Sequence, residues 1–336
     1  PEEEWLCEDC WQQLPADDVL RMLLAGESSN TSPLLHRAHV LCRGKGRVVR
    51  HVACETLAAA LPTIVRVLRK PEDPELWSEH LTAACVLAAL CTTDEGVETR
   101  RLALVKEGGV NALLDVANET FRSPPDEWSE SLCGAVCEAI YRACELGGAG
   151  AYAACEQAFE AGVVDTLAEI MSLHDPTIKF GAFQGADTAL STLTYFLREL
   201  SYTDQKKARR YGLRIIESDI VELLTRTVRE RPAHAWPLGQ NPLDTIAKLC
   251  GVPCKGGNPI KEEARRRTLK AGVLDLLDVS DEAVRWALGD PRAFRGPTAN
   301  PYANLPTAQE ELYKVLAQMQ RNFHLLALSH DELGVI

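Results

Sequence analysis

Cysteines provide the one residue pattern in this sequence that has the spacing of metal ligands. Cys7 and Cys10 are separated by two residues, as in half of a zinc site. A structural zinc ion needs four ligands, so Cys250 and Cys254 would have to supply the second pair. That arrangement requires the two ends of an elongated chain to meet. We therefore expect structural thiols, with no bound metal and no redox chemistry.

Basic clusters are the second group of residues that could do chemistry. They could bind phosphate or an acidic protein. The alternative, which we favour, is that they lie on solvated helix faces and pair with neighbouring carboxylates. Arg209 and Arg210 remain candidates for partner contacts. The three clusters are Lys206, Lys207, Arg209 and Arg210; Arg265, Arg266 and Arg267; and the run from Arg43 to Arg50.

Catalytic signatures are missing from the sequence. It has no nucleotide-binding loop, nucleophile elbow, HExxH motif or paired-carboxylate pattern. The Gly-rich stretch at 255–259 lacks the strand before it and the helix after it that a phosphate cradle requires. His51, near Cys54 on a predicted helix, is interpreted as a packing residue. We therefore predict a protein that is not an enzyme, has no cofactor and is not built for a small-molecule ligand.

The charge balance and the hydropathy pattern limit the partners further. The 336 residues contain 36 Lys and Arg against 48 Asp and Glu, a net charge of −12. This excess of acid argues against nucleic acid as the main ligand. No run of about 18 apolar residues is present, so we expect no membrane-spanning helix.

The use of cysteine indicates the compartment. Most of the 12 cysteines sit in apolar helical stretches such as LTAACVLAALC, where a thiol behaves as a small hydrophobic group. This spread does not resemble the disulfide framework of a secreted domain. We expect an intracellular and most simply cytoplasmic protein, with an organelle, after removal of a transit peptide, as the alternative.

The elements that must position these residues follow from an internal repeat. A small residue is followed two positions later by one aliphatic residue and three positions after that by another. The middle aliphatic residues of the four copies are 54, 56 and 54 residues apart, which marks a stacked repeat protein. The copies are Gly108, Val110 and Leu113; Gly162, Val164 and Leu167; Ser218, Ile220 and Leu223; and Gly272, Leu274 and Leu277.

Each copy has similar flanks. A short polar helix is predicted before it, and a longer apolar helix is predicted after a loop that often contains Pro. The Gly that opens the copy permits a tight turn between the first two helices. Weaker copies place Leu20 and Ile64 in the same register. In the long helix over 186–200, apolar residues recur every three or four positions, so we expect Leu193 to be buried between adjacent third helices.

A short helix, a Gly-led second helix and a long third helix together resemble the armadillo repeat over roughly residues 15–290. The resemblance implies an all-α, right-handed α-solenoid of about five three-helix repeats. Residues 1–14 form an acidic N-terminal segment, 291–306 a Pro- and Gly-rich linker, and 307–336 a C-terminal amphipathic capping helix and tail. The HEAT-type α-solenoid is the close alternative.

Armadillo proteins read extended peptides along their third helices, often through a ladder of Trp and Asn. Aligning the third helices tests whether that ladder exists here. The Trp position holds Cys85, Glu138 and Ser191, and the Asn position holds Ala89, Arg142 and Tyr195, so the ladder is missing. Glu138, Arg142 and Tyr195 are our candidates for residues that face a partner, with Trp236 in a long insertion.

Three functions remain open. The first is a non-catalytic adaptor that binds a protein partner through its concave face and loops. The second is a structural subunit of a large assembly, and the third is a regulator of a chaperone or an enzyme.

Overall fold

The computed structural model describes residues 13–26, 31–70, 77–92, 95–121, 126–145, 147–175, 178, 181–230, 245, 246, 249 and 261–271. The elements in these residues are helices, and the described part contains no strand. The chain divides into two compact units, residues 1–192 and 193–336. The predicted N-terminal segment lies almost wholly outside the described residues, and the predicted linker (291–306) and capping helix (307–336) lie wholly outside them.

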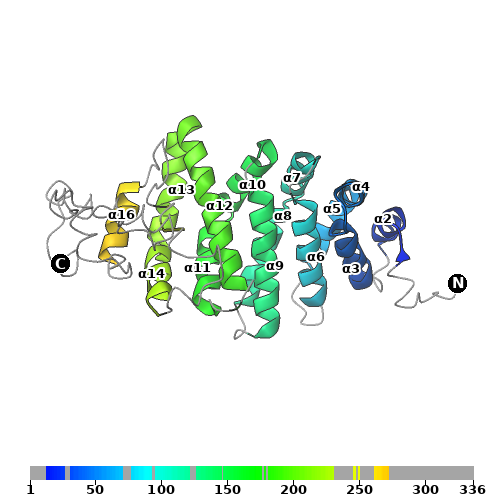
Figure 1. Ribbon diagram of the computed structural model, residues 1–336, viewed down its shortest axis with the longest axis horizontal. Coiled ribbons are helices and arrows are strands. Elements are labelled where there is room, and N and C mark those ends of the chain that lie inside the picture. The colour runs from blue at the N-terminus through cyan, green and yellow to red at the C-terminus, as the bar shows by residue number, and fades with distance from the viewer. Residues whose placement is uncertain are drawn as a thin grey trace, which may run out of the picture. The chain divides into compact units, whose positions relative to one another are not determined.

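In the first unit the predicted order of two short helices and one long helix recurs (Figure 1). The helices α4, α5 and α6 form one such set, α7, α8 and α9 the next, and α10, α11 and α12 a third. The elements are α2 (Ala16–Ala25), α3 (Thr31–Cys42), α4 (Arg47–Leu57), the 3₁₀ turn η2 (Ala58–Ala60), α5 (Leu61–Leu68), α6 (Trp77–Leu90), α7 (Val97–Lys106), α8 (Gly109–Thr120), α9 (Glu127–Cys144), α10 (Ala149–Glu160), α11 (Val163–Leu173) and α12 (Ala182–Thr203), which runs on past the boundary.

The turn before each second helix has the left-handed backbone that the repeat predicts. Gly108 has φ 68° and Gly162 has φ 87°, values that a residue without Cβ adopts freely. Each carbonyl accepts from the amide four residues on, which starts α8 and α11. The predicted Gly-led turn is confirmed at these two positions.

The third copy of the repeat was assigned one residue too early. We predicted that Ser218 opens the turn, but Asp219 is the residue with φ 59°, and its carbonyl accepts from the Leu223 amide at 2.9 Å. Val221 and Leu224 therefore take the two aliphatic positions of the motif; the predicted Ile220 is fully buried as well, while the predicted Leu223 is half-buried. Aspartate tolerates positive φ better than most residues, which is why the motif survives without its glycine.

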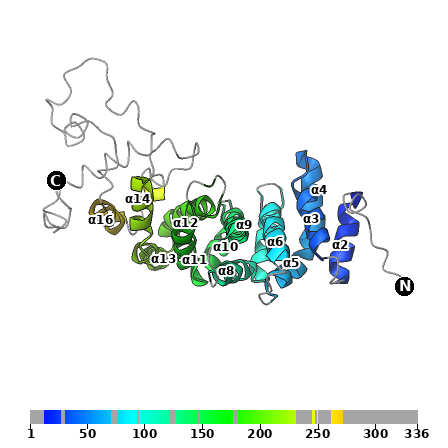
Figure 2. The ribbon, with the colours of Figure 1, turned by 90° about the horizontal axis from the view of Figure 1, so that it is seen from below.

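The helices of the first unit stack one beside the next (Figure 2), and their buried side chains form its core. The long helices α3, α6 and α9 pack side by side, and α7 packs against α10. The buried side chains are mostly Leu, Val, Ala and Cys. Gly134 and Gly185 bring α9 and α12 together, because a Cβ at Gly185 would come within 2.8 Å of Cys137 Cβ. Small residues thus set the spacing of the third helices.

The second unit continues the same kind of packing in its described part. It contains the end of α12, then α13 (Gln205–Glu217), α14 (Ile220–Glu230) and α16 (Lys261–Lys270). Helix α16 is joined to α14 through Arg267, which pairs with Glu222 at 3.0 Å and with Asp219 at 3.1 Å. One of the predicted basic clusters therefore neutralises neighbouring carboxylates, as the favoured interpretation expected.

One helical stretch has the length and apolar composition that could cross a membrane. It runs from Arg47 to Leu68 through α4, η2 and α5, with a mean hydropathy of 1.4 in its most apolar window. Length and composition are weak evidence, because a core helix passes the same test. Cys54, Leu57 and Ile64 in this stretch are fully buried among the other helices. The expectation that the chain does not span a membrane stays a prediction.

Leu193 provides a test of the assigned helix register. Its side chain is fully buried, as predicted. Leu193→Ala should lower the free energy of unfolding by about 2–5 kcal/mol, because a buried cavity remains. Leu102→Ala on the exposed side of α7 is the matched control and should change it by about 0.5 kcal/mol or less. Urea denaturation of both variants checks this, and equal midpoints would contradict the register.

Candidate interaction surface

A stripe of small side chains runs along the solvent-facing side of α6. No side chain of this helix is fully exposed. The half-buried residues Ser78, Thr82 and Cys85 share one side of the helix, and half-buried Thr92 follows its C-terminal end. The Thr82 hydroxyl donates to the Ser78 carbonyl at 2.7 Å, and the Thr92 hydroxyl donates to the Ala88 carbonyl at 3.2 Å. The stripe is therefore uncharged, and both threonine hydroxyls are satisfied within the helix.

Longer side chains on α3 and α9 border this stripe. We call the solvent-facing sides of α3, α6 and α9 together the third-helix face. On the α3 side His36 and Val40 are exposed, and exposed Arg43 follows the helix. Burial raises the pKa of the Cys85 thiol, Arg43 lowers it and Glu138 raises it. The Cys85 thiol in the stripe is therefore influenced by the positive charge of Arg43, after α3, and by the negative charge of Glu138 on α9.

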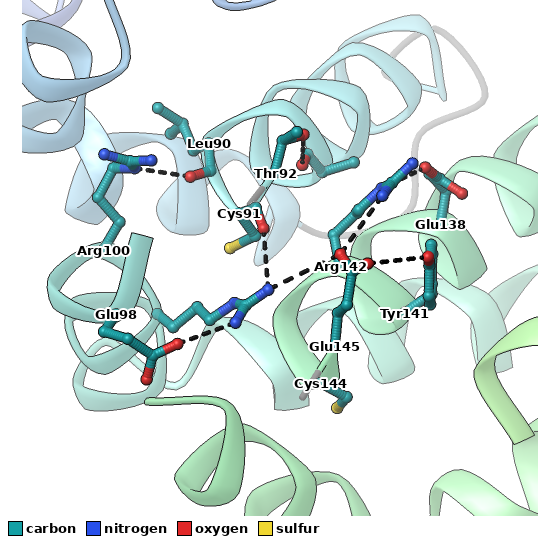
Figure 3. A network of polar contacts seen from close by, with 12 residues as sticks. Leu90, Cys91, Thr92, Glu98, Arg100, Glu138, Tyr141, Arg142, Cys144 and Glu145 are labelled. Carbon is teal, nitrogen blue, oxygen red and sulfur yellow. Dashed lines mark hydrogen bonds and ion pairs between the residues drawn. The ribbon is translucent and has the colours of Figure 1, made fainter. Parts of the chain in front are cut away.

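The α9 side of the stripe is a connected ionic network (Figure 3). Arg142 Nε donates to Glu138 Oε1 at 2.8 Å, and Arg142 Nη1 donates to Glu145 Oε2 at 3.3 Å. Its guanidinium carbon lies 4.7 Å from the centre of the Tyr141 ring, and the Tyr141 hydroxyl donates to Glu145 at 3.2 Å. Burial alone would lower the pKa of Arg142, but Glu138 and Glu145 leave it raised. Arg142 is thereby held as a fixed cation with its edge toward solvent.

Behind this network lie two arginines that are almost completely buried. The side chains of Arg100 and Arg101, both on α7, are 1% exposed. Arg100 Nε donates to the Leu90 carbonyl at 2.7 Å, and Arg101 Nη2 donates to the Cys91 carbonyl at 3.3 Å. Both therefore cap the C-terminal end of α6, whose last carbonyls have no partner within the helix.

Carboxylates from two neighbouring repeats compensate these buried charges. Arg100 pairs with Glu55 of α4, and Arg101 pairs with Glu98 of its own helix at 2.9 Å. Arg101 also lies 3.9 Å from Glu145 at the end of α9, so the buried pair touches the network of the third-helix face (Figure 3). Each guanidinium group thus joins neighbouring repeats in the first unit.

Two further carboxylates join one repeat to the next at helix starts. The Glu98 carboxylate accepts from the Gly150 amide of α10 at 2.7 Å, and the Glu130 carboxylate of α9 accepts from the Ala182 amide of α12 at the same distance. The other oxygen of Glu130 lies 2.6 Å from Nδ1 of buried His174. A negative charge at a helix start is favourable, so these contacts fix the order of the stack.

The structure brings together two of the six predicted contact residues. Glu138 and Arg142 share one network on α9, as described above. Tyr195 is half-buried on α12, with the Arg198 guanidinium 5.2 Å from its ring centre. Arg209 and Arg210 are exposed on α13, and Arg210 stacks on Tyr211 at 4.9 Å. Trp236 and the thiols of Cys7, Cys10, Cys250 and Cys254 lie outside the described residues.

The described cysteines are free, and most of them are buried. Cys85 alone among them is half-buried. Within the part of the chain that the structure describes, no three His, Cys, Asp or Glu side chains are grouped as a metal site would need. His51 is half-buried near buried Cys54, and its Nδ1 has no partner among the described residues.

Sequence reasoning missed the burial of Arg100 and Arg101. They were assigned to a polar first helix, which is solvated on its outer side. The signal that could have found them is their adjacency, since neighbouring helix positions point about 100° apart. Two consecutive arginines on a helix packed on both sides cannot both reach solvent. The C-terminal carbonyls of α6, ten residues before each of them, are the groups that needed a donor.

Comparisons with known proteins bear on the fold alone. A designed armadillo repeat protein matches with a TM-score of 0.59 and 12% identity, over 90% of this chain and 99% of that chain. An engineered protein from a structural genomics programme matches with the same score and identity, over 90% and 95% of the two chains. No protein-family model matches the sequence, and no curated protein matches it significantly. The chain is therefore an all-α solenoid of the armadillo type, as the sequence predicted, and its function must be argued from its surface.

The buried thiols predict how stability depends on pH. Burial raises the pKa of Cys91 to about 12, although Arg101 and Arg100 lower it, and raises that of Cys133 to about 11. In the unfolded chain a thiol ionises near pH 8.5. Above that pH the unfolded state loses thiol protons that the folded state keeps. The free energy of unfolding therefore has its full value below about pH 8.5 and falls as the pH rises toward 12.

Urea denaturation between pH 7 and pH 10 measures this fall. Cys91→Ala and Cys133→Ala remove one titrating thiol each, so each variant should show a shallower decrease above pH 8.5 than the unmodified chain. Cys85→Ala is the control for a thiol that is only half-buried. Identical slopes for all the proteins would show that burial does not hold these thiols protonated.

Proposed function

We propose that this chain is a non-catalytic scaffold that binds a segment of a protein partner along the third-helix face. The observation that carries the proposal is the uncharged stripe of α6, bordered by Arg43 on one side and by Glu138 and Arg142 on the other. The armadillo fold is commonly used for protein interactions, which supports a protein partner in general terms.

An extended peptide fits the chemistry of this face. Small side chains on α6 leave room for a backbone, and charged groups on the two borders can reach its amides, carbonyls and side chains. Arg142 is already desolvated in part and held by Glu138 and Glu145, so ordering it on binding costs little side-chain entropy. Preorganised cations and anions of this kind set the direction of a bound segment more than its affinity.

The absence of a Trp and Asn ladder limits the choice of partner. Cys85 and Glu138 stand where the family has Trp, and Ala89 and Arg142 stand where it has Asn. Regular hydrogen bonding of a peptide backbone by successive Asn side chains is therefore not available on α6 and α9. The partner is recognised through charge at the borders of the stripe.

Affinity capture with matched variants tests this proposal. The double variant Glu138→Ala/Arg142→Ala removes the charged border, whereas Asp165→Ala removes an exposed charge from the second helix α11. We expect the double variant to retain at least tenfold less of the captured partner than the unmodified chain, and Asp165→Ala to retain the same amount. Equal capture by all three proteins would show that the partner does not bind at the third-helix face.

Alkylation of Cys85 gives an independent readout of the same experiment. This thiol lies in the stripe, so the bound partner should slow its reaction with iodoacetamide, as measured by mass spectrometry of its peptide. A captured partner that leaves the rate unchanged would bind elsewhere. A fixed, near-stoichiometric set of captured proteins that survives a salt wash would indicate a subunit of a large assembly instead of an adaptor.

A further inference from the structure

Helix α4, the first helix of the set α4–α6, carries an exposed aliphatic face. Val48, Val49 and Val52 are 74%, 60% and 57% exposed and lie within one turn of each other on the helix. Ala53, Cys54 and Leu57 on the other side of α4 are buried in the core. We call the three valines the α4 valine face. An exposed aliphatic cluster of this kind indicates a contact surface.

Comparison with α10 shows what normally covers this face. Cys54 and Cys155 are equivalent, because each thiol lies near the carbonyl of the cysteine that ends the preceding third helix, Cys42 and Cys144 respectively. With this alignment Val49 corresponds to Gly150, which is buried.

In α10 the position equivalent to Val49 is covered by the first helix of the preceding repeat, whereas Ala149 and Ala153, the equivalents of Val48 and Val52, are exposed and half-buried. Glu98 of α7 accepts from the Gly150 amide, and Gln157 of α10 donates to the Val105 carbonyl of α7 at 3.0 Å. The described helices α2 and α3 pack against α4, but no described first helix takes the place that α7 has next to α10 (Figure 1). The α4 valine face is therefore the position where the first helix of the first repeat would pack.

The positive charges around the α4 valine face favour binding of an acidic segment. Residues 31–54 contain five Lys or Arg residues and no Asp or Glu, in a chain of net charge −12. Arg43, Lys45 and Arg47 are exposed, and none of them has an ion-pair partner among the described residues. Nε of Arg50 and Nδ1 of His51 are shielded from solvent and have no partner in that part either. Helix α4 also begins without a side-chain cap, whereas Glu98 serves the start of α10.

We propose that the α4 valine face is the docking surface of the acidic segment of this same chain, residues 1–12. Only the sequence of this segment enters the argument, since it lies outside the described residues. It contains five carboxylates and no Lys or Arg, with three large apolar side chains, Trp5, Leu6 and Trp11. In the sequence it precedes α2, which takes the place of a second helix in its repeat.

Charge and size both match the proposed occupant. Residues 1–12 contain five carboxylates, and residues 31–54 contain five Lys or Arg residues with no Asp or Glu among them. Valine at the position of Gly150 prevents an approach as close as that of α7, so the occupant must reach the valines with long side chains. Trp5, Leu6 and Trp11 have that reach.

Disulfide trapping in the full chain tests the proposal, using Cys7 and Cys10 as native probes in the segment. Val49→Cys places a thiol on the valine face, and Leu102→Cys places one on an exposed part of α7 as a matched control. Both variants also carry Cys85→Ser, which removes the one described native thiol that is not buried. Each is incubated with oxidised glutathione and mapped by mass spectrometry under non-reducing conditions.

We expect the Val49→Cys variant to form an intramolecular disulfide with Cys7 or Cys10 in at least tenfold higher yield than the Leu102→Cys control. Adding Arg47→Glu and Arg50→Glu, or 1 M salt, should reduce that yield about fivefold or more. Equal yields at the two positions would overturn the proposal. Crosslinks that appear only between two molecules and rise with protein concentration would also overturn it, and would assign the face to a second copy of this chain.

Discussion

The described part of the first unit depends on the burial of two guanidinium groups between neighbouring repeats. Arg100 and Arg101 remove two positive charges from water, which is costly unless each charge is paired and hydrogen-bonded. Glu55, Glu98 and the carbonyls at the end of α6 supply those partners. Because the partners come from the preceding repeat and from the arginines' own repeat, the two arginines are satisfied only when these repeats are stacked in the correct order.

This arrangement also connects the core to the candidate interaction surface. Glu145 accepts from Arg142 on the third-helix face and lies within ion-pair distance of buried Arg101. The position of Arg142 therefore depends on how α7 packs beneath α9. A partner that draws Arg142 away would change the balance of charge around Arg101, so binding at the surface and packing of the repeats are energetically linked.

Much of the fold follows from short-range signals in the sequence. Gly108 and Gly162 mark left-handed turns because a residue without Cβ adopts them at no cost, and the apolar spacing around Leu193 gives its burial. The error at Ser218 has a physical cause. The search for a small residue overlooked that Asp219 also tolerates positive φ, and the next buried residues shifted with it.

The surface was harder to predict than the helices. Alignment of the third helices brought out Glu138 and Arg142, since residues at one repeat position share one face. The pairing of Arg142 with Glu145 and the burial of Arg101 depend on how far α7 and α9 approach, which no pattern along the chain encodes. The α4 valine face was missed because Val48 and Val49 lie within the run from Arg43 to Arg50, which was considered only for its charge.

Arg101 holds neighbouring repeats together through its contacts with the end of α6 and with Glu98 and Glu145. Native-state hydrogen exchange of Arg101→Ala tests this most directly. Removing one partner of a buried ionic network typically costs about 3–5 kcal/mol, and here the loss should lower amide protection in α6, α7, α9 and α10 together. Loss of protection confined to α7, with the neighbouring helices unchanged, would show that the repeats are held by apolar packing alone.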